Sequence, residues 1–413
     1  VIKFVKPVKF PIIKNQGENI NVEIRSKSVG MINLFRNGQL IAQNYSDSLS
    51  HSFSTQNVGK NYLHYEFQSS GNTYTDSIYY IVENGQVIQD PPSYVKNGIN
   101  YINDSTVILL LEAPYKDFVY LISDLNNWEL DPQFKMNKSI NGEKYWIEIN
   151  NLQPNFEYLF QYFVDAQIKI ADPYSTKVIS EYDQQIPNSV YPNLISYPYN
   201  KTTHQVSVIK SNQDNYNWQN QSFNAPDSRD LVIYELLIRD FSFRSDYQTV
   251  IDSLHHLKKL GVNAIQLMPI VEFDGLSSWG YAPTFFFAAE KYYGPDYVLK
   301  SLIDSCHSND IAVILDVVFN HAFRPNPWLR LYYDKGRDEP TSQSPWFNPT
   351  ATHPFNVGYD FNHSSPLVHT FIDSALNYWT TEFKFDGYRF DLSKGFTQFN
   401  SGNDVGLWSS YDL

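Results

Sequence analysis

Two charged residues near the end of the chain have the spacing of catalytic side chains. They lie in the run Asp386-Gly387-Tyr388-Arg389-Phe390-Asp391, which has the character of a short strand. Strand side chains alternate between two faces, so Arg389 and Asp391 point the same way. A guanidinium group favours the ionised form of a neighbouring carboxylate, and an ionised carboxylate can serve as a nucleophile. A structural ion pair has the same spacing, so this pair alone leaves both interpretations open.

A second polar group follows an apolar strand-like run. Asp316 ends the stretch Ile311–Asp316, and Asn320 and His321 come shortly after it. In a parallel barrel, polar side chains at the carboxyl ends of the strands meet at one mouth. A carboxylate in this position can also cap a turn, and a lone histidine is more often a hydrogen-bonded loop residue.

The elements around these residues alternate between strand and helix from residue 231 onward. Helical spacing predicts helices, and short apolar runs predict buried parallel strands. The expected strands are 231–236, 263–268, 311–316 and 385–391, and the expected helices are 247–260, 297–309 and 367–380. This order predicts residues 206–413 as the first half of a (β/α)₈ TIM barrel, with an insertion at 317–366. Because four strands would leave an open sheet edge, we expect a longer parent protein.

The first 205 residues have a different, all-β pattern. Short alternating runs separated by Asn-Gly and Ser-Gly turns predict an Ig-like β-sandwich over 1–92, ending in the stiff segment Asp90-Pro91-Pro92-Ser93. Further strands predict a second sandwich over 93–205. Trp128 and Trp146 in this part are either core residues, the favoured interpretation, or platforms for sugar rings. The fold class is therefore multidomain, with N-terminal sandwiches before a barrel half.

Four motifs in the barrel half together resemble glycoside hydrolase family 13, the α-amylase family. They are Asp316-Val317-Val318-Phe319-Asn320-His321, Gly387 to Lys394, Ser278-Trp279-Gly280-Tyr281-Ala282-Pro283 with Tyr292-Tyr293-Gly294, and Asp360-Phe361-Asn362-His363. Their order also matches the family. The stretch from Val119 to Trp128 is similar to the start of the starch- and glycogen-binding sandwich modules that precede many such barrels.

The resemblance implies catalytic roles for two residues. Asp391 would attack the anomeric carbon as the nucleophile, and Arg389 would hold it ionised and oriented. Family members also have a glutamate general acid on the fifth strand, which would lie beyond Leu413. Because a retaining mechanism needs both carboxyl groups, the chain as given is expected to be inactive and the parent protein active.

Substrate and metal contacts are implied by the same resemblance. His321 would bond the sugar before the cleaved bond, Tyr281 would stack beneath it, and Lys394 would contact the leaving-group side. Asp316 would support the mouth of the site through hydrogen bonds.

Calcium is the cofactor that the resemblance implies, and no organic cofactor is expected. Asn320 and Asp360 match positions that often ligate a structural calcium ion, for which oxygen donors are suited. Gly395 departs from the pattern, because many calcium-dependent relatives have histidine there.

The expected activity is hydrolysis of α-1,4 bonds in an α-glucan such as starch or glycogen, because Lys394 resembles enzymes with that preference. A debranching enzyme acting on α-1,6 bonds, a transglycosylase and a non-catalytic glucan-binding homologue are the alternatives. A surface adhesion protein built of sandwiches is a weaker alternative, since it leaves the barrel half unexplained.

Composition restricts the classes of partner. The net charge is −13, which disfavours nucleic acid, and 42% hydrophobic residues suffice for packed cores. The sequence contains no run of 18 apolar residues and therefore predicts no membrane-spanning helix. The single cysteine, Cys306, is expected to be a buried structural thiol. Extra sandwiches and an Asn- and Tyr-rich composition suggest a secreted or cell-envelope bacterial protein.

Overall fold

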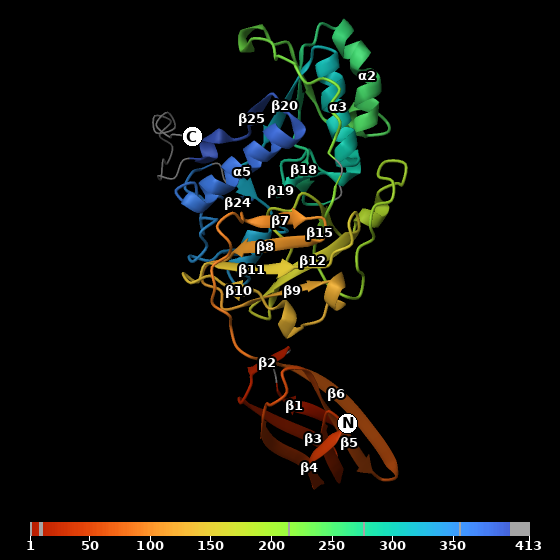
Figure 1. The fold of residues 1–413 in the computed structure, drawn as a ribbon, viewed down its shortest axis with the longest axis vertical. Helices are drawn as coiled ribbons and strands as arrows, with labels where there is room; N and C mark the ends of the chain where they lie inside the picture. Colours follow the sequence, from red (N-terminus) through yellow and green to blue (C-terminus); the bar gives the residue numbers. More distant parts are fainter. Residues whose placement is uncertain (1, 8–10, 214, 276, 355–356, 397–413) are drawn as a thin grey trace. The chain divides into compact units, whose positions relative to one another are not determined.

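The computed structural model describes residues 2–7, 11–213, 215–275, 277–354 and 357–396. The chain divides into two compact units, and Figure 1 labels many of their helices and strands. The first unit comprises Val1–Tyr94, Lys116–Ile147 and Tyr162–Ile168, and the second comprises Val95–Tyr115, Glu148–Gln161 and Lys169–Leu413. The predicted boundaries at residues 92 and 205 stay a prediction.

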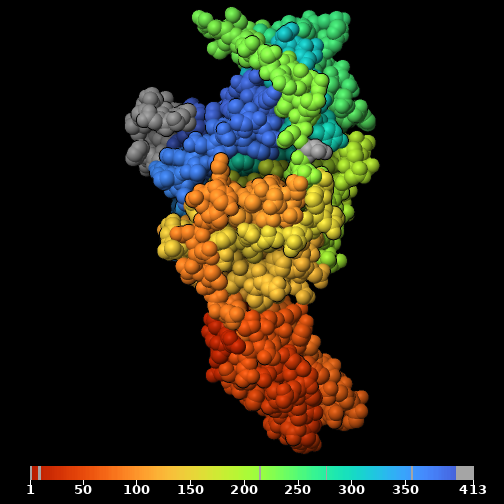
Figure 2. All heavy atoms as spheres, in the orientation of Figure 1, coloured from red at the N-terminus to blue at the C-terminus, as the bar shows by residue number. Residues whose placement is uncertain are grey.

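A six-stranded sheet dominates the first unit. Its strands are β1 (Lys3–Lys6), β2 (Ile12–Asn15), β3 (Asn19–Arg36), β4 (Gln39–Ser54), β5 (Gly59–Ser69) and β6 (Asn72–Glu83). The order is β1-β3-β5-β6-β2, with β4 paired to β3, and β2 runs parallel to β6. Alternate residues of β5, including Leu63, Tyr65 and Phe67, pack with Ile32 and Leu34 of β3 in the core. The atoms of residues 11–83 are closely packed on the face shown in Figure 2.

One long strand, β3, contains two alternating runs of the sequence, at 21–25 and 31–36. Its pairing with β4 shifts register between Arg25 and Gly30, and this irregularity separates the two alternating runs. A Cβ atom on Gly30 would lie 2.4 Å from the carbonyl oxygen of Gln68 on β5, so only glycine permits this close approach. The two-layer sandwich stays a prediction.

Short strands and turns make up the rest of the first 210 residues. They are β7 (Gly98–Asn103), β8 (Thr106–Glu112), β9 (Val119–Ser123), β10 (Asn137–Lys138), β11 (Lys144–Ile149), β12 (Glu157–Val164), β13 (Ile168–Ile170), β14 (Val178–Ile179) and β15 (Val206–Lys210). In the second unit, β7 pairs with β8, and β15 pairs with β12 and β14. Trp128 and Trp146 of the first unit are buried, as the core interpretation predicts.

A four-stranded parallel sheet carries the residues expected to do chemistry. Its order is β16 (Ile233–Leu236), β17 (Ala264–Leu267), β20 (Ala312–Val317) and β25 (Gly387–Phe390). Helices α2 (Tyr247–Lys259), α3 (Asp296–Ser308) and α5 (Pro366–Phe383) alternate with the strands, as predicted for the first half of a barrel (Figure 1). Asp246 caps α2 by accepting a hydrogen bond from the Thr249 backbone nitrogen at 2.8 Å. The closed barrel stays a prediction.

Smaller elements lie between these strands. They are α1 (Ile238–Phe241), β18 (Val271–Phe273), β19 (Pro283–Ala289), β21 (His321–Ala322), α4 (Pro327–Leu331), β22 (Tyr333–Asp334), β23 (Glu339–Pro340) and β24 (Tyr359–Asp360), with 3₁₀ helices η1 (Asp124–Asn126), η2 (Pro132–Phe134), η3 (Asp183–Gln185), η4 (Ser228–Asp230), η5 (Lys291–Tyr293) and η6 (Ser393–Phe396). Cys306 of α3 is buried. None of the helices in the described parts of the chain combines the length and apolar character needed to cross a bilayer.

Candidate active site

The centre of the candidate site is a guanidinium group shared by two carboxylates. Strand pairing places Arg389 of β25 opposite Asp316 of β20. Arg389 Nη1 donates to both carboxylate oxygens of Asp316 at 3.0 Å and to Asp391 Oδ1 at 2.7 Å. The structure therefore brings together three residues that lie in two motifs of the sequence.

The two carboxylates differ in their access to solvent. Asp316 is fully buried, whereas the side chain of Asp391 is 21% exposed. Burial raises the pKa of Asp316 to about 6, against the opposing effects of hydrogen bonds from Tyr281 and Arg389. Asp391 is thus the carboxylate that an incoming ligand can reach, and Asp316 contacts Arg389 from the buried side.

The backbone after Asp391 turns sharply. Strand β25 ends at Phe390, and the Asp391 backbone nitrogen donates to the Val317 carbonyl oxygen at 2.9 Å. Leu392 then has a φ of 42°, in the left-handed region that is unfavourable for a branched side chain. Such strain is common at functional sites. The turn leads into η6, where Lys394 is exposed.

Tyr281 connects the guanidinium centre to His321. The Tyr281 hydroxyl donates to Asp316 Oδ2 at 2.8 Å, and its carbonyl oxygen lies 2.9 Å from His321 Nε2. A carbonyl oxygen only accepts, so Nε2 carries the proton and Nδ1 is the acceptor. His321 Nδ1 is buried and has no hydrogen-bond partner among the described residues. Burial also lowers the pKa of His321, which favours the neutral ring with an unprotonated Nδ1.

A buried ion cluster anchors the hairpin that leads to Tyr281. Lys291 pairs with Glu272 of β18 and lies 3.5 Å from Asp183 Oδ2. Glu290 is also buried nearby, and the charges of Lys291 and Asp183 influence it. Burial raises the pKa of Glu272 and of Glu290, and the charge of Lys291 opposes this rise at both residues. Sequence reasoning did not single out this cluster, because Asp183 lies far from Glu272, Glu290 and Lys291 in the chain.

The two residues predicted to bind calcium lie on neighbouring segments. Strand β21 pairs His321 with Asp360 of β24, and the Phe361 backbone nitrogen donates to the Asn320 carbonyl oxygen at 3.0 Å. Asp360 contacts two residues that the sequence did not indicate, Asn348 and His353. Both come from an irregular part of the insertion that has no periodic pattern.

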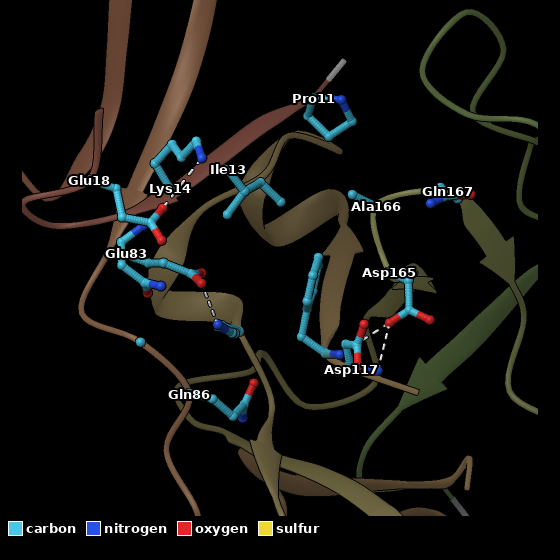
Figure 3. Close-up of a pocket in the computed structure, with 14 residues that line it drawn as sticks. Pro11, Ile13, Lys14, Glu18, Glu83, Gln86, Asp117, Asp165, Ala166 and Gln167 are labelled. Atoms are coloured by element: carbon cyan, nitrogen blue, oxygen red, sulfur yellow. Dashed lines mark hydrogen bonds and ion pairs between the residues drawn. The ribbon is translucent and has the colours of Figure 1, made fainter. Parts of the chain in front are cut away.

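A separate cavity of about 620 Å³ lies wholly within the first unit (Figure 3). Its charged side chains are largely engaged with each other or with the backbone. Lys14 pairs with Glu18 at 3.6 Å, Lys135 with Glu83 at 2.5 Å, and Asp165 accepts from the Asp117 backbone nitrogen at 2.8 Å. We therefore assign no reaction to this cavity.

Comparison with known proteins identifies the family. Residues 209–365 match the α-amylase catalytic domain. This part of the chain is similar to the catalytic domain of the α-amylase family, glycoside hydrolase family 13. This match includes the motif with Asp316 and His321, and it ends before β25. The family resemblance inferred from the sequence is therefore confirmed.

Individual members of the α-amylase family are similar over parts of the chain. A malto-oligosyltrehalose trehalohydrolase of Saccharolobus solfataricus is 32% identical over 205 residues, covering 49% of this chain and 34% of the relative. Isoamylase SU1 of Zea mays, a chloroplastic protein, is 30% identical over 276 residues, covering 58% of this chain and 32% of the relative. The chain thus spans about a third of the length of these relatives. The crystal structure of the group B Streptococcus pullulanase SAP has a similar fold, with a TM-score of 0.54 and 18% identity over 95% of this chain and 54% of that one.

Proposed function

We propose that the protein hydrolyses α-glucans with retention of the anomeric configuration, and that Asp391 is the nucleophile. The observation that carries the proposal is the hydrogen bond of 2.7 Å between Arg389 Nη1 and Asp391 Oδ1. A hydrogen bond from a charged donor orients a carboxylate for attack. The names of the relatives, among them isoamylases and 1,4-α-glucan branching enzymes, support an α-glucan as substrate.

Asp316 has a supporting role in this proposal. Its carboxylate is fully buried, and hydrogen bonds from Arg389 and Tyr281 engage both of its oxygens. It cannot approach a substrate without breaking these bonds. It therefore positions Arg389, which in turn positions Asp391.

The remaining predicted residues would bind the sugar rings. His321 would accept a hydroxyl hydrogen through Nδ1, which has no partner among the described residues. Tyr281 would present its ring to the sugar, since its hydroxyl is already committed to Asp316. Lys394 would contact the leaving-group side.

The proposed mechanism requires a second carboxyl group. In retaining glycosidases the acid and the nucleophile lie about 5 to 5.5 Å apart. The general acid would protonate the glycosidic oxygen while Asp391 forms a bond to the anomeric carbon. Water then releases the sugar from Asp391. We expect the acid on the strand that follows β25 in the longer protein.

The bond that is cleaved is proposed to be α-1,4, on the basis of Lys394 three residues after the nucleophile. Debranching at α-1,6 bonds is the second candidate, because isoamylases from three plants are among the relatives. Amylose contains only α-1,4 bonds, while pullulan adds α-1,6 bonds. Product analysis on both polymers separates the two candidates.

The test uses the longer protein and its Asp391→Asn variant. We expect reducing sugar from starch, and a loss of about 3 orders of magnitude or more in kcat for the variant. A matched control is Asp310→Asn, which changes an exposed aspartate that pairs with Lys258 at the surface. Equal rates for the wild type and Asp391→Asn would refute the assignment, and a folded, inactive wild type would favour a glucan-binding protein.

A further inference from the structure

Asp360 is enclosed by nitrogen donors. Its exposed fraction is 3%. Its Oδ1 atom is 3.0 Å from His353 Nε2, and its Oδ2 atom is 2.7 Å from Asn348 Nδ2. Asn348 Nδ2 also donates to the Phe361 carbonyl oxygen at 3.2 Å, which fixes the orientation of the amide group. Both oxygens of Asp360 therefore accept hydrogen bonds from N–H groups.

This arrangement does not fit the calcium ion that the family resemblance implies. Calcium takes about 6 to 8 oxygen ligands at about 2.3 to 2.6 Å. Asn320 Oδ1 is suited to a cation, since it is buried and has no partner among the described residues. The Asp360 carboxylate, however, faces two N–H groups, whose partial positive charge repels a cation. Across the described parts of the chain, no group of three acidic, histidine or cysteine side chains is arranged to hold a metal.

Position 395 shows where the imidazole of His353 lies. A Cβ atom built on Gly395 would be 2.7 Å from Asn320 Cβ and 3.2 Å from His353 Nε2. A side chain at 395 would thus collide with Asn320 and crowd the imidazole. Glycine at 395 and histidine at 353 are therefore compatible with each other, and they explain the departure from the family pattern at Gly395.

We propose that the imidazole of His353 replaces calcium as the group that holds the long insertion together next to the candidate active site. Its N–H bond to Asp360 holds β24, and β24 pairs with β21, which carries His321. A nitrogen donor thus holds the Asp360 carboxylate by a hydrogen bond, in place of coordination to an ion. The local structure around His321 is then independent of calcium.

The experiment measures thermal unfolding of the longer protein with excess EDTA and with 5 mM CaCl₂ as alternatives. We expect the same Tm in both conditions. His353→Ala leaves a buried carboxylate short of one donor, which should lower Tm by about 4 °C in both. His353→Gln retains an N–H donor and should recover part of this loss. His255→Ala, at an exposed position on α2, is the matched control and should leave Tm unchanged.

The Asp360→Asn variant assigns any effect of calcium to a location. A calcium-dependent Tm that disappears in Asp360→Asn would overturn the proposal, because the ion would then bind at Asp360. A calcium effect of equal size in the wild type and Asp360→Asn comes from elsewhere and agrees with it. An unchanged Tm in His353→Ala would also overturn the proposal. None of these readouts depends on activity, so they stand apart from the test of Asp391.

Discussion

Arg389 lies opposite Asp316 on the neighbouring strand, and its Nη1 atom is 3.0 Å from each oxygen of the Asp316 carboxylate. The same atom is 2.7 Å from Asp391 Oδ1. One nitrogen therefore couples a fully buried carboxylate to one that a ligand can reach. Through this contact a buried residue orients the proposed nucleophile, so the geometry of the site depends on the side chain at position 389.

Arg389→Lys tests this coupling. A lysine keeps the positive charge but replaces the rigid, planar guanidinium group with a compact ammonium group on a flexible stem. We expect kcat to fall by about 10² to 10³, the size of effect seen when one preorganised electrostatic contact is removed. Steady-state kinetics on starch measures the change, with Arg229→Lys, whose side chain is 86% exposed, as the control. Full activity in Arg389→Lys would show that charge alone suffices.

The pH dependence of kcat should report Asp316. Burial raises the pKa of Asp316 to about 6, and only its ionised form attracts Arg389 strongly. Activity should therefore decline as the pH falls through about 6. The hydrogen bond from Tyr281 lowers the pKa of Asp316, so Tyr281→Phe should move this acid limb to higher pH. Profiles between pH 4 and 9 would show the shift, and Tyr297→Phe, at an exposed position, is the control. An acid limb that does not move would mean that another group sets it.

Much of the parallel sheet was predictable because its pattern is local. Helix α2 begins at the predicted Tyr247 and ends one residue before the predicted Leu260, next to Gly261 with its φ of 82°. Helix α5 begins at Pro366, one residue before the prediction, because proline is suited to the first helical position. Strand β25 ends before Asp391, where the left-handed Leu392 interrupts it.

Other features were not predictable, because their stabilising contacts are distant in sequence. Strand β4 has the run Asn44-Tyr45-Ser46-Asp47-Ser48, whose polar composition resembles a loop. It extends because it pairs along most of β3. His353 meets Asp360 inside an irregular insertion, so no periodicity indicates the contact. The motifs around Asp316 and Arg389 were informative because strand pairing, which parallel topology fixes, brings them together.

Asp296 at the start of α3 should make folding stability depend on pH. Burial raises its pKa to about 6, so the folded protein holds this proton at pH values where the unfolded chain has released it. The stabilisation is complete below the unfolded pKa of about 3.9 and is lost as the pH rises through 6. Asp296→Asn cannot ionise, so its unfolding free energy relative to wild type should increase between pH 4 and 7. Urea unfolding at both values measures the difference, and a constant difference would contradict the prediction.

Lys291→Met should destabilise the second unit, because it removes the ammonium group from a buried cluster of carboxyl groups. Lys291 is 3% exposed and pairs with Glu272, with Asp183 Oδ2 at 3.5 Å. Loss of one partner from a buried ion pair costs about 3 to 5 kcal/mol. Methionine has a similar length, so packing changes little, and urea unfolding should show a loss of this size. The charge of Lys291 lowers the pKa of Glu272, so in the variant this carboxyl group should bind a proton more readily. The loss of unfolding free energy should therefore be greater at pH 8 than at pH 5.

The control is Lys258→Met, at an exposed ion pair with Asp310, which should lose little stability at either pH. An equal loss at both pH values would show that the contribution of Lys291 is packing rather than charge.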